Sequence, residues 1–519
     1  MNKKRTVILV LIALVAISGA FFIGAGIFNS SDDVQANLKK FNQILAIVEE
    51  RYPDTIEPDK VIYSAIRGML RNLDPHSNFL DEKAYADLSE EQQGKFYGLG
   101  IQIAKRGEDK PLIVISPIDN TPAKRAGIIA GDIITHIEGK DTMGMTIQDA
   151  VKKLKGPKGT KVSITIKRPG IDEPLEFTVE RDEIPLESIT NAFIIRPGTG
   201  YIRISSFNQT TYKDFDAAIK NLESQGMERL ILDLRENSGG LLDQAVLVAS
   251  RFVGESKMVV FTKGRIRTAN QEFYSEDNVP HGTFPLIILV NRGSASASEI
   301  VSGAVQDHDR GLIIGETTFG KGLVQRSYPL PNNTGLLLTT ARYYTPSGRL
   351  IQRDYSSFED YYLAEELPDQ PVTENQNNKE IRHTDSGRIV YGGGGITPDV
   401  IIKQAELSKF LVKLIRDSLF LEFSAKYNQA NPAMDRTFTV TDRVIGEFKD
   451  FLKAKKAEFT EEDLKNDDQF LRAYIKATIF SVKWGRKEEA KVLVESDPQV
   501  QKALELFPEA VKLASASPK

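Results

Sequence analysis

The sequence predicts a multidomain α+β protein, and three observations support this fold class. The length of 519 residues allows about three domains of roughly 100 to 200 residues each. Apolar residues recur at helical spacing near both ends of the chain, whereas the part between them contains short β-rich runs separated by Gly, Pro and Asp. Farther along, buried-strand runs alternate with helical stretches, which is typical of an α/β domain.

The composition excludes several classes of protein. Apolar residues make up 41% and charged residues 27% of the chain, so neither a fully disordered chain nor a multi-span membrane protein fits. The net charge of −4 provides no broad basic field, and we expect no nucleic-acid partner. Without Cys, the chain forms no disulfide and no Cys-ligated metal centre. The five His are widely spaced, and we expect no metal or other cofactor.

Residues 1–30 predict a signal-anchor segment. After three basic residues at positions 3–5, residues 6–28 carry no charge, and as a helix they would span roughly 35 Å, enough for a ~30 Å hydrocarbon layer. The basic flank favours the cytoplasmic side, which places the rest of the chain in the cell envelope, on the periplasmic or extracytoplasmic face of the inner membrane. The alternative is a signal cleaved after Ala20, which would make the protein secreted.

Changes in periodicity divide the remainder into four predicted domains. Residues 34–94 have helical spacing interrupted by Pro, and we expect a helical N-terminal domain. Residues 95–182 form a compact β-rich module. Residues 183–404 form an α/β domain, in which residues 354–388 are expected to be a long, partly mobile surface loop. Residues 405–519 are expected to form a C-terminal helical extension, whose role the sequence does not reveal.

A run of small residues follows one of the predicted buried strands. The segment SASAS at positions 294–298 lies between a strand at 285–290 and a helix that begins near Ser298. A hydroxyl there would be exposed beside a helix N-terminus, whose free N–H groups and dipole favour the negative charge of a tetrahedral intermediate. The same serines could equally be ordinary helix caps, which is the commonest role of Ser at such a place.

A serine nucleophile needs a base, and two candidates follow the SASAS segment. His308 lies in a polar helix end, where a capping role is ordinary. Lys321 is flanked by Gly and apolar residues, and burial of its ammonium group would lower its pKa toward the range of a general base. Gln325 follows four residues later, and its amide could hold the amine in line.

The segment around Lys321 also resembles a phosphate-binding loop. GETTFGKG at positions 315–322 fits the pattern GxxxxGK[ST] except at Gly322, which replaces the hydroxyl residue that would bind magnesium. The residues that follow have the pattern of a strand, whereas a phosphate-binding loop requires a helix. Both departures disfavour nucleotide binding.

Five motifs occur together: LDPHS at 73–77, DLRENSGG at 233–240, SASASE at 294–299, GETTFGKG at 315–322 and GITPD at 395–399. With them, roughly residues 35–405 resemble the C-terminal processing peptidases, also called tail-specific proteases. The resemblance implies a Ser/Lys-dyad endopeptidase with a crotonase-like α/β protease core and an inserted PDZ domain. It further implies protein substrates bound by their C-terminal tails, and it is compatible with a homo-oligomer.

The resemblance assigns roles to individual residues. Ser296 corresponds to the nucleophile, Lys321 to the general base and Gln325 to the residue that orients the base. The oxyanion hole corresponds to the backbone N–H groups of Gly240 and Ala297. Four of these positions lie within the shared motifs, and Gln325 lies three residues after one of them.

The β-rich module contains a second site suggested by resemblance. FYGLGI at positions 96–101 resembles the carboxylate-binding loop of PDZ domains, in which successive backbone N–H groups capture a peptide C-terminus. Leu99, Gly100 and Ile101 are the expected donors. TPAKRAGI at 121–128 and GDII at 131–134 match PDZ sequences in the same order, although the Gly-Leu-Gly alone would be read as a glycine-rich turn.

The sequence therefore predicts an extracytoplasmic serine endopeptidase that recognises protein C-terminal tails through a PDZ domain and cleaves with Ser296 and Lys321. Two alternatives belong to other classes. A catalytically silent PDZ scaffold would deliver protein tails to another protease, and it would have no need of a complete Ser296, Lys321 and Gln325 set. A P-loop protein would bind nucleotide.

Overall fold

The computed structural model describes residues 32–357 except 106, 108, 278 and 280, together with residue 361 and residues 380–516. The chain divides into two compact units, with the boundary between Leu73 and Asp74. The predicted membrane segment at residues 6–28 lies outside the described residues. Among the helices that are described, none combines the length and apolar character needed to cross a membrane.

The first unit contains the helices α2 (Asp32–Arg51) and α3 (Pro58–Arg71). Pro58 lies in the first turn of α3, where the missing N–H of proline removes no helical hydrogen bond. The apolar side chains of Leu38, Phe41 and Ile44 on α2 are exposed. The residues predicted to be helical near the N-terminus thus form two helices, with Pro53 in the connection between them and Pro58 at the start of α3.

A short strand and a helix open the second unit. The strand β1 is Asn78–Leu80 and the helix α4 is Glu82–Gln93. Gly94 ends α4 in the left-handed conformation with a φ of 70°, which favours glycine. Helix α4 leads into the β-rich module and also packs against the strand β18 (Thr334–Tyr344) of the α/β domain.

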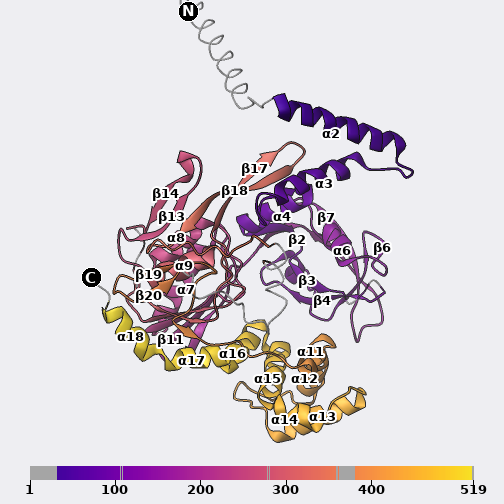
Figure 1. The fold of residues 1–519 in the computed structure, drawn as a ribbon. Helices are drawn as coiled ribbons and strands as arrows, with labels where there is room; N and C mark the ends of the chain where they lie inside the picture. The colour runs from indigo at the N-terminus through magenta and orange to yellow at the C-terminus, as the bar shows by residue number, and fades with distance from the viewer. Residues whose placement is uncertain are drawn as a thin grey trace, which may run out of the picture. The chain divides into compact units, whose positions relative to one another are not determined.

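The β-rich module is an antiparallel sheet with short helices, and its last strand pairs with its first (Figure 1). Its elements are β2 (Lys95–Gly98), β3 (Ile101–Ala104), β4 (Leu112–Pro117), α5 (Pro122–Arg125), β5 (Ile133–Ile137), β6 (Lys140–Asp141), α6 (Ile147–Leu154), β7 (Lys161–Lys167), β8 (Leu175–Glu180) and β9 (Asp182–Pro185). The strand order is β3-β4-β5-β7-β8, with β6 beside β5, so β3 is an edge strand. Strands β2 and β9 pair with each other at the base of the module.

The α/β domain is built on a second, mostly parallel sheet. Its elements are β10 (Ile189–Arg196), β11 (Thr199–Ile204), α7 (Thr211–Ser224), β12 (Arg229–Asp233), α8 (Leu242–Ser250), β15 (Leu286–Val290), α9 (Ala297–Asp307), β16 (Leu312–Gly315) and β21 (Val400–Ile401). The order is β10-β11-β12-β15-β16-β21, in which only the β10–β11 pair is antiparallel. The carboxyl ends of β12 and β15 therefore meet at one edge, where ligand sites of such sheets form.

Side-chain alternation separates two cores on opposite faces of this sheet. Leu232 and Ile288 belong to the core under α7, α8 and α9. Their chain neighbours Ile231 and Ile287 belong to another core, which includes Phe507 from the C-terminal helices. The end of the chain therefore covers one face of the α/β sheet, as Figure 1 shows for the yellow helices beside β11.

Another sheet of the α/β domain joins distant parts of the chain. Its remaining strands are β13 (Met258–Lys263), β14 (Gln271–Tyr274) and β17 (Leu323–Leu330), and a 3-10 turn at Arg267–Ala269 separates β13 from β14. The strand order is β1-β18-β13-β14, with β17 also paired to β18. Strands β1 and β17 pair with the same part of β18, and the segments that precede them are brought near each other.

The C-terminal extension is helical. Its elements are α11 (Lys409–Arg416), α12 (Leu419–Ala430), α13 (Asp442–Ala454), α14 (Glu461–Asn466), α15 (Asp468–Trp484), α16 (Arg486–Ser496), α17 (Pro498–Glu505) and α18 (Phe507–Ala516). Phe448, Leu471 and Ile475 lie in a core formed by α11 to α16, and α17 and α18 contribute to the core of the α/β sheet. The extension is thus anchored to the α/β domain by its last helices.

The predicted surface loop at residues 354–388 is not a loop throughout. Residues 358–360 and 362–379 lie outside the described residues. Tyr361 has no exposed surface, and the stretch ends within a hairpin, after β19 (Ile381–His383) and just before β20 (Ile389–Tyr391). The polar composition of this stretch predicts a loop, but it does not reveal that Tyr361 is buried.

Candidate active site

The nucleophile candidate occupies a strained turn between β15 and α9. Ser294 Oγ donates to Leu234 O at 2.8 Å, and the Ala295 N–H donates to Asn237 O at 2.9 Å. These bonds fix the turn against the residues that follow β12. Ser296 is the N-cap of α9 and has a φ of 54°, an uncommon conformation for a residue other than Gly that costs about 1–3 kcal/mol. The surrounding bonds hold Ser296 at the carboxyl edge of the sheet.

The glycine loop, residues 237–240, lies directly against this turn. A Cβ atom added to Gly239 would come within 2.7 Å of Ser296 Cβ, and one added to Gly240 would come within 2.1 Å of Phe207 O. Neither position has room for a side chain. The described part of the chain provides no acceptor for the backbone N–H of Gly240 or of Ala297. Both groups can therefore donate to an oxyanion.

Lys321 lies in the loop between β16 and β17. Its amine donates to Gln325 Oε1 at 2.8 Å, and Gln325 Nε2 donates to His76 O at 2.6 Å. The register of β17 against β18 shifts between Val324 and Gln325. Such a bulge changes the direction of the side chains beside it, and here it accompanies the contact between Gln325 and the amine.

Ser296 and Lys321 line one pocket, which has a volume of about 300 Å³ and is also lined by Gly240, Gln325 and residues of α4. Within the described chain, no hydrogen bond joins Ser296 Oγ to Lys321 Nζ, and such contacts are often long in substrate-free enzymes. Burial lowers the pKa of Lys321, although nearby carboxylates act in the opposite direction. Burial thus favours the neutral amine that a general base requires.

A buried carboxylate joins the two candidate residues. Glu299 has no exposed surface, and its Oε2 accepts the backbone N–H groups of Ser296 at 2.8 Å and Lys321 at 2.9 Å. Its Oε1 accepts the Gly320 N–H at 2.8 Å and the Thr318 hydroxyl at 2.6 Å. Burial raises the pKa of Glu299 to about 7, although these hydrogen bonds favour the charged form. The role of Glu299 does not follow from the sequence, because its Ser-x-x-Glu spacing signals only a helix cap.

The LDPHS motif forms a turn that supports the lysine side of the site. Asp74 accepts the N–H groups of His76 and Ser77 and the Ser77 hydroxyl. Burial would raise the pKa of Asp74, but these hydrogen bonds outweigh it and lower the pKa. Burial and the charge of Lys321 lower the pKa of His76 to about 4, and its Nε2 lies 2.6 Å from Tyr361 Oη. In the sequence, the LDPHS motif indicates only the family resemblance, and these contacts of its residues are not predicted from it.

The structure does not support the two alternatives, a Ser/His triad through His308 and a phosphate-binding loop around Lys321. His308 Nδ1 lies 2.9 Å from Asp385 Oδ2 and its Nε2 lies 2.7 Å from Met258 O, and His308 does not line the Ser296 pocket. The residues after Lys321 form strand β17, where a phosphate-binding loop would continue as a helix. Neither a Ser/His triad through His308 nor a P-loop is formed.

The predicted tail-binding residues lie at the edge strand of the β-rich module. Leu99 and Gly100 connect β2 to β3, and Ile101 is the first residue of β3. The carbonyl groups of Leu99 and Gly100 accept hydrogen bonds from the segment after β4, whereas no described residue accepts from their own N–H groups. Gly100 has a φ of 76°, and a Cβ atom there would lie 2.4 Å from the side chain of Thr121. The loop thus requires glycine and keeps two donors available.

Four known families match successive parts of the chain. Peptidase family S41 matches residues 198–356, and a PDZ domain matches residues 113–168. The N-terminal domain of the activating protease CtpB matches residues 26–84, and the C-terminal helical domain of probable PDZ-proteases matches residues 410–466. These four matches follow one another along the chain.

Comparisons with individual proteins decide the family. A carboxy-terminal-processing protease of Bartonella bacilliformis is 42% identical over 328 residues, which are 62% of this chain and 74% of that relative. The chain belongs to the carboxy-terminal processing proteases of family S41. A Synechocystis protease of this type is 40% identical over 56% of this chain and 68% of its own length. The solved photosystem II D1 C-terminal processing protease is 29% identical, covers 69% of this chain and 85% of its own, and has a TM-score of 0.35.

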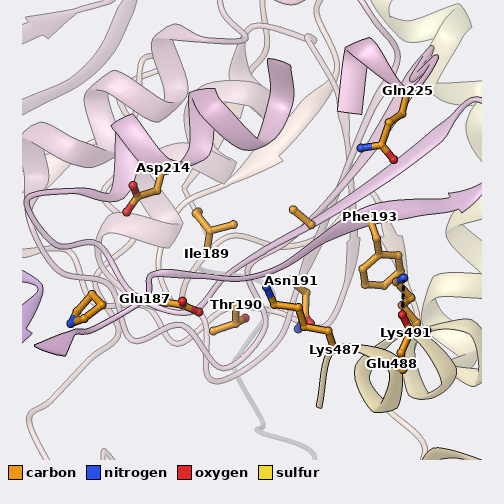
Figure 2. A pocket seen from close by; sticks show the side chains of 12 residues that line it. Glu187, Ile189, Thr190, Asn191, Phe193, Asp214, Gln225, Lys487, Glu488 and Lys491 are labelled. Atoms are coloured by element: carbon orange, nitrogen blue, oxygen red, sulfur yellow. Dashed lines mark hydrogen bonds and ion pairs between the residues drawn. The ribbon is translucent and has the colours of Figure 1, made fainter. Parts of the chain in front are cut away.

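The protease has a second and larger pocket, of about 580 Å³, between β10 and α16. Figure 2 shows Lys487, Glu488 and Lys491 of α16 beside Asn191 and Phe193 of β10. Lys491 donates to Glu488 at 3.1 Å, so charges of opposite sign are paired within the wall of the pocket. None of the predicted site residues lines it.

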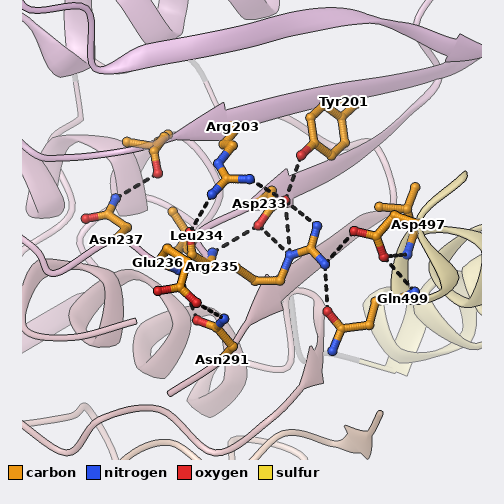
Figure 3. A network of polar contacts seen from close by, with 12 residues as sticks. Tyr201, Arg203, Asp233, Leu234, Arg235, Glu236, Asn237, Asn291, Asp497 and Gln499 are labelled. Carbon is orange, nitrogen blue, oxygen red and sulfur yellow. Dashed lines mark hydrogen bonds and ion pairs between the residues drawn. The ribbon is translucent and has the colours of Figure 1, made fainter. Parts of the chain in front are cut away.

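A buried polar network connects the glycine loop of the protease to its C-terminal helices (Figure 3). Asp233 ends β12 without exposed surface and accepts Arg235 Nη2 at 2.6 Å. Arg235 Nη1 donates to Gln499 Oε1 at 2.6 Å and lies 2.8 Å from Asp497 Oδ2, at the start of α17. Arg235 lies two residues before the glycine loop, and the C-terminal helices therefore contact the segment that leads into this loop.

Replacing Gly240 with Ala should lower kcat/KM by about 10²- to 10³-fold, the usual cost of losing one oxyanion donor. The added Cβ atom cannot remain 2.1 Å from Phe207 O, so the loop must move and take its N–H group away from the site. Steady-state kinetics on a fluorogenic peptide would measure the loss, with circular dichroism to verify the fold.

Gly254→Ala is the matched control, because a Cβ atom there meets only Lys257 Cγ, at 3.8 Å. Its kcat/KM should equal that of the unmodified protease. Unchanged kinetics in a folded Gly240→Ala variant would show that the Gly240 N–H does not bind the oxyanion.

Proposed function

We propose that the protein is an extracytoplasmic endopeptidase in which Ser296 is the nucleophile and Lys321 is the general base. The environment of the Lys321 amine carries this proposal: burial lowers its pKa, Gln325 holds it, and it lines the same pocket as Ser296. A solvated lysine stays protonated at neutral pH and cannot accept a proton. Membership of family S41 supports hydrolysis of peptide bonds as the reaction.

In acylation, one proton passes from Ser296 to Lys321 and then from Lys321 to the departing amine. The neutral Lys321 amine takes the proton of Ser296 Oγ as this oxygen attacks the carbonyl carbon of the substrate. The carbonyl oxygen becomes an oxyanion that accepts the N–H groups of Gly240 and Ala297. When the C–N bond breaks, the Lys321 ammonium gives its proton to the departing amine. An ester on Ser296 and a neutral Lys321 remain.

Deacylation repeats these steps with water as the nucleophile. Lys321 takes a proton from water while the water oxygen attacks the ester carbon. As the bond to Ser296 Oγ breaks, the Lys321 ammonium returns a proton to that oxygen. Gln325 accepts a hydrogen bond from the amine in both halves of the reaction and so keeps its orientation.

We also propose that the PDZ domain selects substrates by their C-terminal tails. An extended tail can pair with the edge strand β3, and its terminal carboxylate can accept the N–H groups of Leu99, Gly100 and Ile101. The scissile bond then lies upstream, where the chain reaches Ser296. An apolar terminal residue is expected in the adjoining groove.

The remaining sequence predictions belong to the same proposal. The uncharged stretch at residues 6–28 supports a membrane anchor, with catalysis in the cell envelope. Exposed apolar side chains on α2, among them Phe41, support a homo-oligomer. The two sheets of the α/β domain, with helices α7 to α9 between strands, support a crotonase-like core. The domain limits 34–94, 95–182, 183–404 and 405–519 stay predictions.

Ser296→Ala and Lys321→Arg should each lower kcat by at least about 10⁴-fold. Alanine lacks the attacking oxygen, and the guanidinium of arginine stays protonated at any working pH. Gel assays with an unstructured protein substrate would measure cleavage. Ser224→Ala and Lys220→Arg, at exposed positions of α7, are matched controls that should stay fully active. Cleavage by a purified, folded Ser296→Ala variant would overturn the nucleophile assignment.

Amidating the C-terminus of a peptide substrate should weaken binding by roughly 10- to 100-fold. Amidation removes the charge and one acceptor oxygen, and hydrogen bonds to charged groups are worth about 1.5 to 3 kcal/mol. Turnover of the free-acid and amidated forms of one peptide would be compared below saturation. Equal turnover would show that the protease does not recognise the terminal carboxylate.

A further inference from the structure

The carboxylate of Glu299 has more contacts than a helix cap explains. A capping box joins the N3 side chain to the N-cap N–H, as Glu299 does with Ser296. The protein contains such a box at the start of α14, where the Asp463 side chain accepts the Thr460 N–H and hydroxyl at an exposed surface. Glu299 instead has no exposed surface and accepts three further hydrogen bonds from residues about twenty positions along the chain.

One of these further hydrogen bonds comes from the backbone of Lys321, the proposed base. Oxygen Oε2 of Glu299 accepts the backbone N–H groups of both Ser296 and Lys321, so the two residues share one acceptor atom. Oxygen Oε1 holds Gly320 and Thr318 of the same loop. A single side chain therefore fixes the backbone of the nucleophile and the backbone of the base with respect to each other.

We propose that Glu299 is a positioning residue whose carboxylate fixes the Ser296 turn against the Lys321 loop and whose negative charge faces the Lys321 amine. This inference rests on the proposed Ser/Lys chemistry and assigns to Glu299 two separable effects. One effect is geometric, because a displacement of about 1 Å between reacting groups can cost roughly 10²-fold in rate. The other is electrostatic, because an anion near an amine favours its ammonium form.

Several groups determine the charge of the Lys321 amine. Burial lowers the pKa of Lys321, and the charges of Glu299 and Asp74 raise it. The other titratable groups that face this pair or line the same pocket are His76 before β1, Glu91 on α4, Tyr343 on β18 and the buried Tyr361. Burial raises the pKa of Glu299 to about 7, so its charge changes near neutral pH. A neutral Glu299 no longer favours the ammonium form.

Two substitutions separate the two effects. Glu299→Gln removes the charge, and its NH₂ group faces either the N–H groups of Ser296 and Lys321 or the Gly320 N–H and the Thr318 hydroxyl, so in both orientations at least one N–H donor loses its acceptor and the alignment also suffers. Glu299→Asp keeps the charge and shortens the reach by one methylene. We expect each variant to lose about 10- to 100-fold in kcat, with KM for a fluorogenic peptide changed much less.

The pH profile distinguishes positioning from simple structural support. The acid limb of kcat/KM should move to lower pH in Glu299→Gln, because the Lys321 amine loses a neighbour that favours its protonation. In Glu299→Asp the limb should stay close to that of the unmodified protease. Asp463→Asn, which removes the exposed capping carboxylate of α14, should change neither kcat nor the limb.

The experiment uses the full chain, with thermal unfolding measured for every variant. A fall in activity that only follows the folded fraction, with one common pH limb for both Glu299 variants, would overturn the proposal. Should Glu299→Gln fail to fold, Glu299→Asp decides: a 10-fold or greater loss of kcat at an unchanged unfolding midpoint supports the proposal, and wild-type kcat overturns it. Activity in Lys321→Arg would instead refute the Ser/Lys chemistry itself, whatever the Glu299 variants do.

Discussion

The active site depends on one constraint, which is that a carboxylate removed from water must find hydrogen-bond donors within the protein. Glu299 finds four, at the point where α9 meets the loop before β17. On the carbonyl side of the same residues, the Tyr343 hydroxyl lies 3.1 Å from Ser296 O and also contacts Lys321 O. Two buried side chains thus contact the N–H and C=O groups of both residues, and together with the bonds of Ser294 and Ala295 they keep the strained turn at Ser296 in place.

The scaffold around this centre draws on distant parts of the chain. The parallel sheet brings the loops after β12 and β15 to one edge, where Gly239 lies directly against Ser296. The LDPHS turn reaches Gln325 through the His76 carbonyl. Arg235 connects the glycine loop to Gln499 of α17. The last helices of the C-terminal extension therefore form part of the protease fold and are not a separate appendage.

The sequence predicted features that depend on short stretches of chain. Residues such as those of β15 form a strand because all are apolar, and the family motifs locate Ser296, Lys321 and Gln325 because each lies in a recognisable local pattern. The role of Glu299 could not be predicted, since a Ser-x-x-Glu spacing is the same whether the carboxylate is exposed or buried. The contact of Arg235 with the C-terminal helices joins residues 264 positions apart, and only tertiary packing determines such a pair.

The proposed chemistry requires that the fold supply a lysine amine that is easily deprotonated and that lines the same pocket as a serine. The most direct measurement is an NMR titration of the Lys321 amine in the inactive Ser296→Ala protein, labelled with ¹³C at lysine Cε and assigned by comparison with Lys321→Arg. The Lys321 signal should titrate at lower pH than the signals of the exposed lysines, because burial disfavours its ammonium form. Titration together with the exposed lysines, or above them, would contradict the proposed chemistry.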